Sequence, residues 1–157
     1  MKLYIKQAVF SWNDKFTVRD ESERDRYSVE GEIFTLGKKL HIYNSRGNEV
    51  AYIRQKLLTF MPQYYIEADG QSFEIVKEFT FFNQRFYING LPWTLEGDFF
   101  AHEYAMLGEN NREIMRMSKH WFTWGDSYEL DIHYPPDELM CLCAALAVDC
   151  MLDQQRN

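Results

Sequence analysis

Apolar and polar residues alternate in short segments along most of the chain. The clearest segment is residues 128–134, in which Tyr, Leu, Ile and Tyr alternate with Glu, Asp and His. A period of two places successive side chains on opposite faces of a β-strand, so the pattern predicts short strands with one buried face each. The same alternation recurs in residues 2–6, 15–19, 39–43, 63–67 and 85–88.

Residues that favour turns separate these segments at intervals of roughly ten residues. This spacing is typical of an antiparallel meander and leaves no room for the crossover helices of a parallel sheet. About a dozen strands are expected. An open sheet of that size would expose long apolar edges, so closure into a barrel or a sandwich is favoured. The turn signals are Asn44-Ser45-Arg46-Gly47, Asp69-Gly70, Asn89-Gly90 and Gly108-Glu109-Asn110-Asn111.

A different pattern follows Pro135-Pro136. Asp137 and Glu138 are suited to a helix start, and the stretch from Leu139 to Val148 contains no polar side chain except thiols. A helix that is apolar on every face must be surrounded by protein, and the surrounding available is the preceding sheet. The sequence therefore predicts a mainly β fold: a closed antiparallel barrel of about 12 strands around a buried hydrophobic C-terminal helix.

The sequence predicts one domain over residues 1–157, with strands over about 2–134 and the central helix over about 137–153. The longest uncharged apolar run, residues 139–148, is about half of the roughly 20 residues that span a bilayer, so no transmembrane segment is expected.

Charge and cysteine content narrow the classes of partner and compartment. The formal net charge of −7 works against charge-driven association with nucleic acid or with an anionic membrane surface, and no nucleic-acid partner is expected. The three cysteines lie within residues 141–150, inside the apolar stretch, and an odd number cannot pair completely. Free buried thiols and the lack of a basic-then-apolar leader at residues 1–10 predict a cytoplasmic protein.

Five short segments stand out together with the closing apolar helix: residues 4–7, 14–20, 27–31, 36–43, 53–56 and 137–153. Together they resemble the LURP-one-related family, a member of the tubby C-terminal-like group that includes short bacterial proteins. The resemblance implies a β-barrel of about a dozen strands around a hydrophobic C-terminal helix, and none of the residues that carry it is catalytic. Related proteins imply two functional directions: phosphoinositide binding by tubby proteins and lipid movement by phospholipid scramblases.

Recognition of an anionic lipid headgroup needs several convergent Lys or Arg side chains. The chain offers short basic pairs and one cluster near Trp121 that mixes cations with an aromatic residue, formed by Arg112, Arg116, Lys119 and His120. For the pair beside Gly37, a solvated turn is the competing interpretation. The candidate anion or headgroup contacts are Lys38, Lys39, Arg54, Lys56, Arg112 and Arg116.

The sequence predicts no catalytic, cofactor-binding or metal-binding residue. The four histidines lie on separate segments without ligand spacing, and alternation puts His102 and Glu103 on opposite faces of a strand. Cys141 and Cys143 would point apart on a helix. No cofactor is therefore predicted.

Two hypotheses follow. The preferred one is a non-enzymatic binding or scaffold domain that meets an unknown protein or an anionic lipid headgroup through the barrel exterior. It predicts an exposed apolar or basic patch and no buried cluster of titratable groups. The alternative is an enzyme or small-molecule carrier with a pocket at the barrel mouth, beside the end of the helix.

Overall fold

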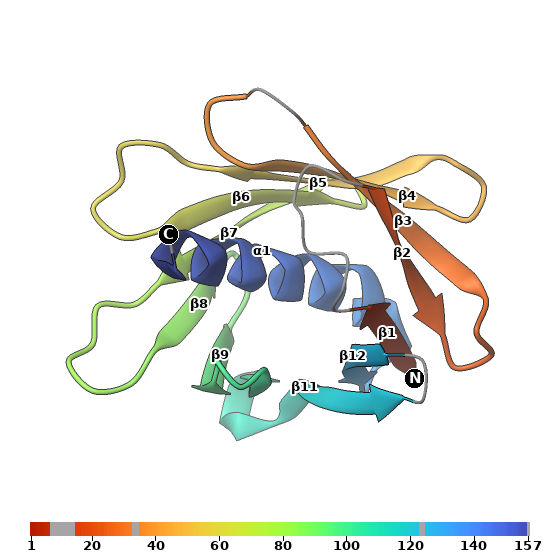
Figure 1. Cartoon of the computed structure of the whole chain (residues 1–157). Helices are drawn as coiled ribbons and strands as arrows, with labels where there is room; N and C mark the ends of the chain where they lie inside the picture. Colours follow the sequence, from red (N-terminus) through yellow and green to blue (C-terminus); the bar gives the residue numbers. More distant parts are fainter. Residues whose placement is uncertain (7–14, 33–34, 123–124, 157) are drawn as a thin grey trace.

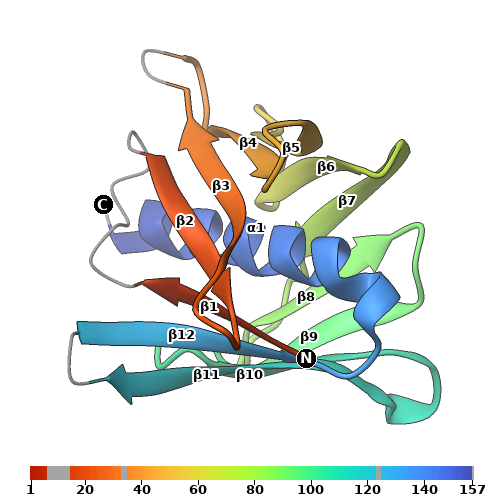
Figure 2. The same ribbon diagram turned by 90° about the vertical axis from the view of Figure 1, so that its right-hand side faces the viewer.

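The structure, a computed structural model, describes residues 1–6, 15–32, 35–122 and 125–156, without the side chains of 120–122, 125, 126 and 156. The described residues form twelve strands. Each pairs antiparallel with the next in the sequence, and β1 pairs with β12 to close the barrel (Figures 1 and 2). The strands are β1 (Lys2–Lys6), β2 (Lys15–Asp20), β3 (Asp25–Gly31), β4 (Lys39–Asn44), β5 (Glu49–Gln55), β6 (Gln63–Ala68), β7 (Gln71–Lys77), β8 (Arg85–Asn89), β9 (Trp93–Asp98), β10 (Glu103–Leu107), β11 (Glu113–Phe122) and β12 (Gly125–Ile132).

Alternation along the strands sorts side chains between the barrel interior and its outer surface. In β1, Leu3 and Ile5 are fully buried, whereas Lys6 is exposed. Where the barrel closes, Leu3 faces Leu130 and Ile5 faces Tyr128 across the β1–β12 ladder, so apolar side chains meet on the inner face. The predicted closed antiparallel barrel of about 12 strands is confirmed.

The helix α1 (Glu138–Arg156) runs through the barrel (Figures 1 and 2). Every side chain from Cys141 to Val148 is fully buried. Alanines at 144, 145 and 147 leave room for the large aliphatic and aromatic side chains of the wall, as close packing in a narrow interior requires. The predicted central helix is confirmed, with its end three residues later than expected. A 3-10 turn, η3 (Pro135–Asp137), leads into it.

One salt bridge attaches the start of this helix to the barrel wall. The Arg26 guanidinium donates two hydrogen bonds, of 2.8 and 2.9 Å, to the buried carboxylate of Glu138. Hydrogen bonding to Glu138 raises the pKa of Arg26 above its ordinary value. A buried carboxylate needs such a partner, so this bridge fixes where the helix enters the barrel.

The two ends of the barrel differ in their connections, because successive antiparallel strands alternate in direction. The connections after β2, β4, β6, β8 and β10 span two to five residues, and we call the end of the barrel that they form the turn end. The β10–β11 connection contains the 3-10 turn η2 (Glu109–Asn111). The connections after β3, β5 and β7 each span seven residues. With the β9–β10 connection they form the loop end, where α1 also ends (Figure 1).

Candidate functional site

Exposed apolar side chains gather at the loop end. Nine large apolar residues are exposed in the part of the chain that the structure describes, and eight lie in loop-end connections. The ninth, Tyr134, lies at the turn end. Single exposed apolar residues are ordinary, but their concentration at one end of a barrel marks a docking surface. This apolar rim consists of Leu36, Leu57, Leu58, Phe60, Phe79, Phe81, Phe82 and Phe100.

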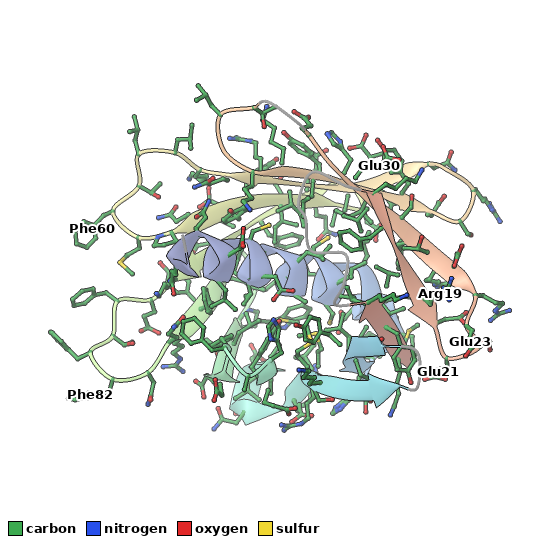
Figure 3. The ribbon with its side chains drawn as sticks, viewed as in Figure 1. Arg19, Glu21, Glu23, Glu30, Phe60 and Phe82 are labelled. Carbon is green, nitrogen blue, oxygen red and sulfur yellow. The ribbon has the colours of Figure 1, made fainter. Side chains whose placement is uncertain are left out.

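The rim side chains project into the surroundings rather than folding back onto the barrel. Phe60, Phe81 and Phe82 are 91%, 85% and 97% exposed. Figure 3 shows Phe60 and Phe82 extending outward from two different loops on the side where α1 ends, whereas Glu21 and Glu23 lie at the opposite side of the view. The rim is therefore a set of separate protruding tips.

The β5–β6 loop, residues 56–62, holds its apolar tip in a strained conformation. Leu58 has a φ of +58° and a fully exposed side chain. The left-handed region costs a residue with a Cβ atom about 1–2 kcal/mol. No burial of Leu58 offsets that cost, which points to a role for the outward leucine. A backbone hydrogen bond of 3.0 Å, from the N–H of Lys77 to the carbonyl of Pro62, ties this loop to β7.

The β7–β8 loop, residues 78–84, is ordered by local contacts. The N–H of Glu78 donates to the carbonyl of Arg85 over 2.8 Å and closes the base of the loop. The Thr80 hydroxyl donates to the carbonyl of Asn83 across the tip. The rings of Phe79 and Phe81 meet edge to face, with centroids 5.3 Å apart. These contacts hold the tip in place while its phenylalanines stay exposed.

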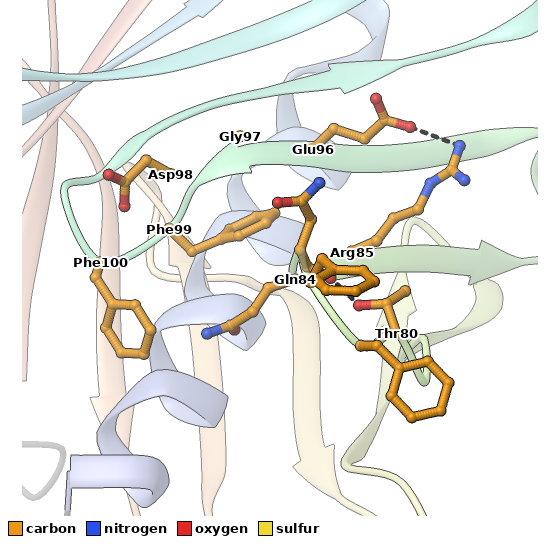
Figure 4. A pocket seen from close by; sticks show the side chains of 11 residues that line it. Thr80, Gln84, Arg85, Glu96, Gly97, Asp98, Phe99 and Phe100 are labelled. Atoms are coloured by element: carbon orange, nitrogen blue, oxygen red, sulfur yellow. Dashed lines mark hydrogen bonds and ion pairs between the residues drawn. The ribbon is translucent and has the colours of Figure 1, made fainter.

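An open pocket of about 930 Å³ lies between this loop and the β9–β10 connection (Figure 4). Phe99 is buried at its inner side, edge to face with Phe86 at 4.8 Å between centroids. Two of the charged groups in the pocket are paired, because an Arg85 amino group lies 2.5 Å from the Glu96 carboxylate, and the carboxylate of Asp98 accepts a hydrogen bond from the Ala101 N–H. The pocket opens at the loop end of the barrel, and the residues that line it come from strands and connections, not from α1. Its lining consists of residues 80–85 and 96–100.

Charge is distributed unequally between the two ends. With one flanking strand residue on each side, the turn-end connections, including that between β12 and α1, carry ten Asp and Glu against three Arg. The β3–β4, β5–β6, β7–β8 and β9–β10 connections, counted the same way, carry five Lys and Arg against four Asp and Glu. Among these described connections, the acidic residues are therefore concentrated at the end opposite the apolar rim.

Four of the predicted anion contacts come together at the base of the β3–β4 and β5–β6 loops. Lys39 lies directly opposite Arg54 in the β4–β5 ladder. These cations have nearby partners, which reduces the charge that they offer to a ligand. Lys38 pairs with Asp153 at 2.5 Å, Lys39 with Glu32 at 3.5 Å and Lys56 with Glu74 at 2.7 Å, while the Arg54 guanidinium lies 4.9 Å from the ring centroid of Tyr65.

The remaining two predicted contacts lie elsewhere. Arg112 is in the β10–β11 connection at the turn end, and Arg116 is in β11, where it pairs with Glu113. β11 lies across the barrel from β5 in the strand order, so the two groups do not converge. The side chains of His120 and Trp121, expected to complete this cluster, lie outside the described residues.

A buried polar cluster connects the helix to the loop end. Asp149 lies in the C-terminal half of α1, is only 5% exposed, and has its carboxylate 3.3 Å from Nε2 of His102. The imidazole stacks on the Tyr128 ring at 4.1 Å. Burial, with a contribution from Asp149, raises the pKa of the neighbouring Tyr104 well above its ordinary value.

This cluster is contrary to the prediction that a binding domain has no buried cluster of titratable groups. The reason is local. His102 adopts a φ of +56° in the β9–β10 turn instead of continuing a strand, so its alternation with Glu103 does not apply. The inward imidazole meets Asp149, and the contact attaches the turn that carries Phe100 to the central helix.

The thiols of the helix are free and buried, as predicted. Burial raises the pKa of Cys141, Cys143 and Cys150 above the ordinary thiol value, which favours the unreactive protonated form. Among the residues that the structure describes, no three His, Cys, Asp or Glu side chains are grouped so as to hold a metal ion. The described part of the chain also contains no helix with the length and apolar character to cross a membrane.

Sequence reasoning did not identify the apolar rim. The signal was present in residues 57–60 and 79–82, where apolar residues cluster beside turn-forming Pro62 and Asn83 instead of alternating. Apolar residues in a connection between strands are unusual, because connections face water. A search for such residues would have found the two principal tips of the rim.

The twelve-stranded closed barrel with a buried C-terminal helix places this chain in the tubby C-terminal-like class of proteins. A family model described as LURP-one-related matches residues 1–149. The chain belongs to the LURP-one-related family.

Two relatives are consistent with this assignment. An uncharacterized protein of Bacillus subtilis (strain 168), YxjI, is 39% identical over 154 residues, which cover 97% of this chain and 94% of that protein. The X-ray structure of the Arabidopsis thaliana protein AT5G01750 superposes with a TM-score of 0.61 at 12% identity, covering 99% of this chain and 91% of the other. The second likeness concerns the fold alone.

Proposed function

We propose that this protein is a non-enzymatic binding domain that docks through the loop end of its barrel, with the apolar rim as the contact surface. The observation that carries the proposal is the gathering of eight of the nine exposed large apolar residues of the described chain at one end. The helix α1 fills the barrel interior, so a partner has to meet the outer surface. The rim is the part of that surface with the most to gain from burial.

Stable binding through the rim requires several of its tips to contact the partner together. Burying one large apolar side chain stabilises a complex by about 1.5–3 kcal/mol, whereas association costs roughly 4–15 kcal/mol in lost freedom of motion. One phenylalanine is therefore insufficient, but the β5–β6 and β7–β8 tips acting together offset the cost. Lys38, Lys39, Arg54 and Lys56 stand beside them and supply contacts to anionic groups of the partner.

A small-molecule carrier is the second candidate, favoured by the pocket of about 930 Å³ between the β7–β8 and β9–β10 loops. A carrier would retain a ligand of defined mass during purification. Native mass spectrometry of the protein, before and after denaturation, separates this candidate from docking, which requires no resident ligand.

Site-specific photo-cross-linking tests docking through the loop end. The cross-linking amino acid p-benzoylphenylalanine replaces Phe82 at the loop end or Tyr134 at the turn end, each in an otherwise unchanged chain. We expect cell extracts to give adducts, with protein or with lipid, at position 82 and only background at position 134. Unlabelled wild-type protein should compete for these adducts and the double variant F81S/F82S should not. Equal labelling at both positions, or equal competition by the variant, would overturn the proposal.

A further inference from the structure

We infer that the partner of the loop end is a lipid surface, into which the apolar rim inserts, an inference that rests on the proposed function. The first reason is the shape of the rim. Its tips are separate loops with an open pocket between two of them, not a continuous face. A protein partner would need a surface complementary to each tip and to the spaces between them. Lipid chains and headgroups adapt to separate protrusions, so insertion needs only that the tips lie at one end.

The second reason is the distribution of charge along the barrel. The acidic turn end and the rim lie at opposite ends of α1, which at 19 residues is about 28 Å long. That separation is several times the Debye length of roughly 8 Å at physiological ionic strength. Docking through the loop end therefore keeps the acidic connections away from lipid phosphates. Docking through the turn end would bring them into contact with those phosphates.

The third reason is the order of groups at the loop end. Leu57, Leu58 and Phe60 lie in the β5–β6 loop, beyond the end of β5, whereas the cations Lys39 and Arg54 lie within β4 and β5. A bilayer interface has the same order, with the acyl boundary inside and the phosphates outside it. Because the lysines already pair with carboxylates, apolar insertion is the driving contribution, and no particular anionic headgroup is required.

Vesicle flotation with the whole protein tests this inference. Vesicles of phosphatidylcholine alone are compared with vesicles that also contain phosphatidylserine, for the wild type and the variants F81S/F82S, L58S/F60S and Y134S. We expect the wild type to bind both vesicle types. Each rim variant should bind about tenfold more weakly or worse. Y134S, which removes an exposed aromatic at the turn end, is the matched control and should bind as the wild type does.

A fluorescent probe reports which end enters the lipid. Because the three native thiols are buried, a cysteine introduced as F82C or Y134C accepts an environment-sensitive dye selectively. Phosphatidylcholine vesicles should shift the emission of the dye to the blue at position 82 and leave it unchanged at position 134. Size-exclusion chromatography and circular dichroism establish that each variant is folded.

Three results would overturn the inference. The first is that the wild type fails to float with either vesicle type. The second is that the rim variants float as well as the wild type. The third is that ultracentrifugation shows a dimer that only the rim variants lose, which would make the partner a second copy of the chain. If cross-linking at position 82 still yields protein adducts while flotation fails, docking through the loop end stands and only the lipid partner is wrong. If both fail, the proposed function fails as well.

Discussion

Gly97 provides a test of how tightly the barrel closes beneath the loop end. It lies in β9 opposite Tyr104 of β10, with a φ of +139°. A Cβ atom added there would lie 2.6 Å from both the carbonyl oxygen of Glu103 and Cα of Tyr104. These are backbone atoms of the paired strand, so they cannot rotate away. Gly97→Ala therefore combines an unfavourable backbone conformation with a steric collision.

The matched control is Gly47 in the β4–β5 turn, which also has a positive φ, +80°, but where an added Cβ meets no atom within 4 Å. Gly47→Ala should cost about 1 kcal/mol from the backbone alone. Gly97→Ala should cost about 3 kcal/mol, because overpacking adds about 1–3 kcal/mol to the backbone cost. For a chain of this length, 1 kcal/mol lowers Tm by about 2–4 °C, so the expected losses are about 3 °C and about 9 °C.

Urea denaturation monitored by tryptophan fluorescence gives the free energy of unfolding of each variant, and thermal melts give Tm. Both proteins should unfold with the wild-type m-value, because the native contacts elsewhere are unchanged. A loss for Gly97→Ala no greater than that for Gly47→Ala would refute the close approach of β10 to β9.

Two further predictions concern ionisable groups. The three thiols of α1 should not react with Ellman's reagent in the folded protein and should all react after denaturation, since burial raises their pKa values; rapid labelling of the native state would contradict a helix enclosed by the barrel. His41 lies 2.8 Å from Glu49 and 2.7 Å from Glu32, and although burial acts to lower its pKa, the two carboxylates raise it above 6.5. The ion pairs of the His41 imidazolium therefore stabilise the fold fully below pH 6.5, and this stabilisation is lost as the pH rises through the higher pKa of the folded state. At low pH the stabilisation lasts until the two carboxylates are protonated. His41→Gln should lower Tm more below pH 6.5 than above pH 8, and a difference independent of pH would show that the imidazolium does not stabilise the fold.

Much of the architecture followed from the order of residues along the chain. A period of two in residues 128–134 and its counterparts indicated strands, because successive side chains of a strand face opposite sides. The apolar stretch from Leu139 to Val148 indicated an enclosed helix, because no face of it could meet water. Both inferences depend on side chains a few positions apart, and the structure confirms a strand and an enclosed helix. The strand β12 ends at Ile132, however, so Tyr134 lies beyond it and is exposed instead of sharing the buried face.

The candidate site could not be predicted in the same way, because it is formed by residues that are far apart in the sequence. The β5–β6 and β7–β8 tips are about 20 residues apart along the chain, and the antiparallel order brings both to the end of the barrel where α1 ends. Asp149 follows the apolar stretch and resembles a solvent-exposed helix end in the sequence, yet the barrel extends past it and His102 meets it there. Glu138 resembles an ordinary first-turn residue, although its partner Arg26 lies 112 positions away.

The sequence pattern of apolar residues in a connection is the same whether the fold buries these residues or exposes them. By itself the sequence predicted a set of short strands, one enclosed helix, and the inward face of each strand that it assigned, because hydrophobic periodicity acts over a few residues. Only the tertiary structure decided that the apolar loops share one end and the acidic turns share the other. That separation arises from closure of an antiparallel barrel, which orders connections by the direction of their strands and not by their composition.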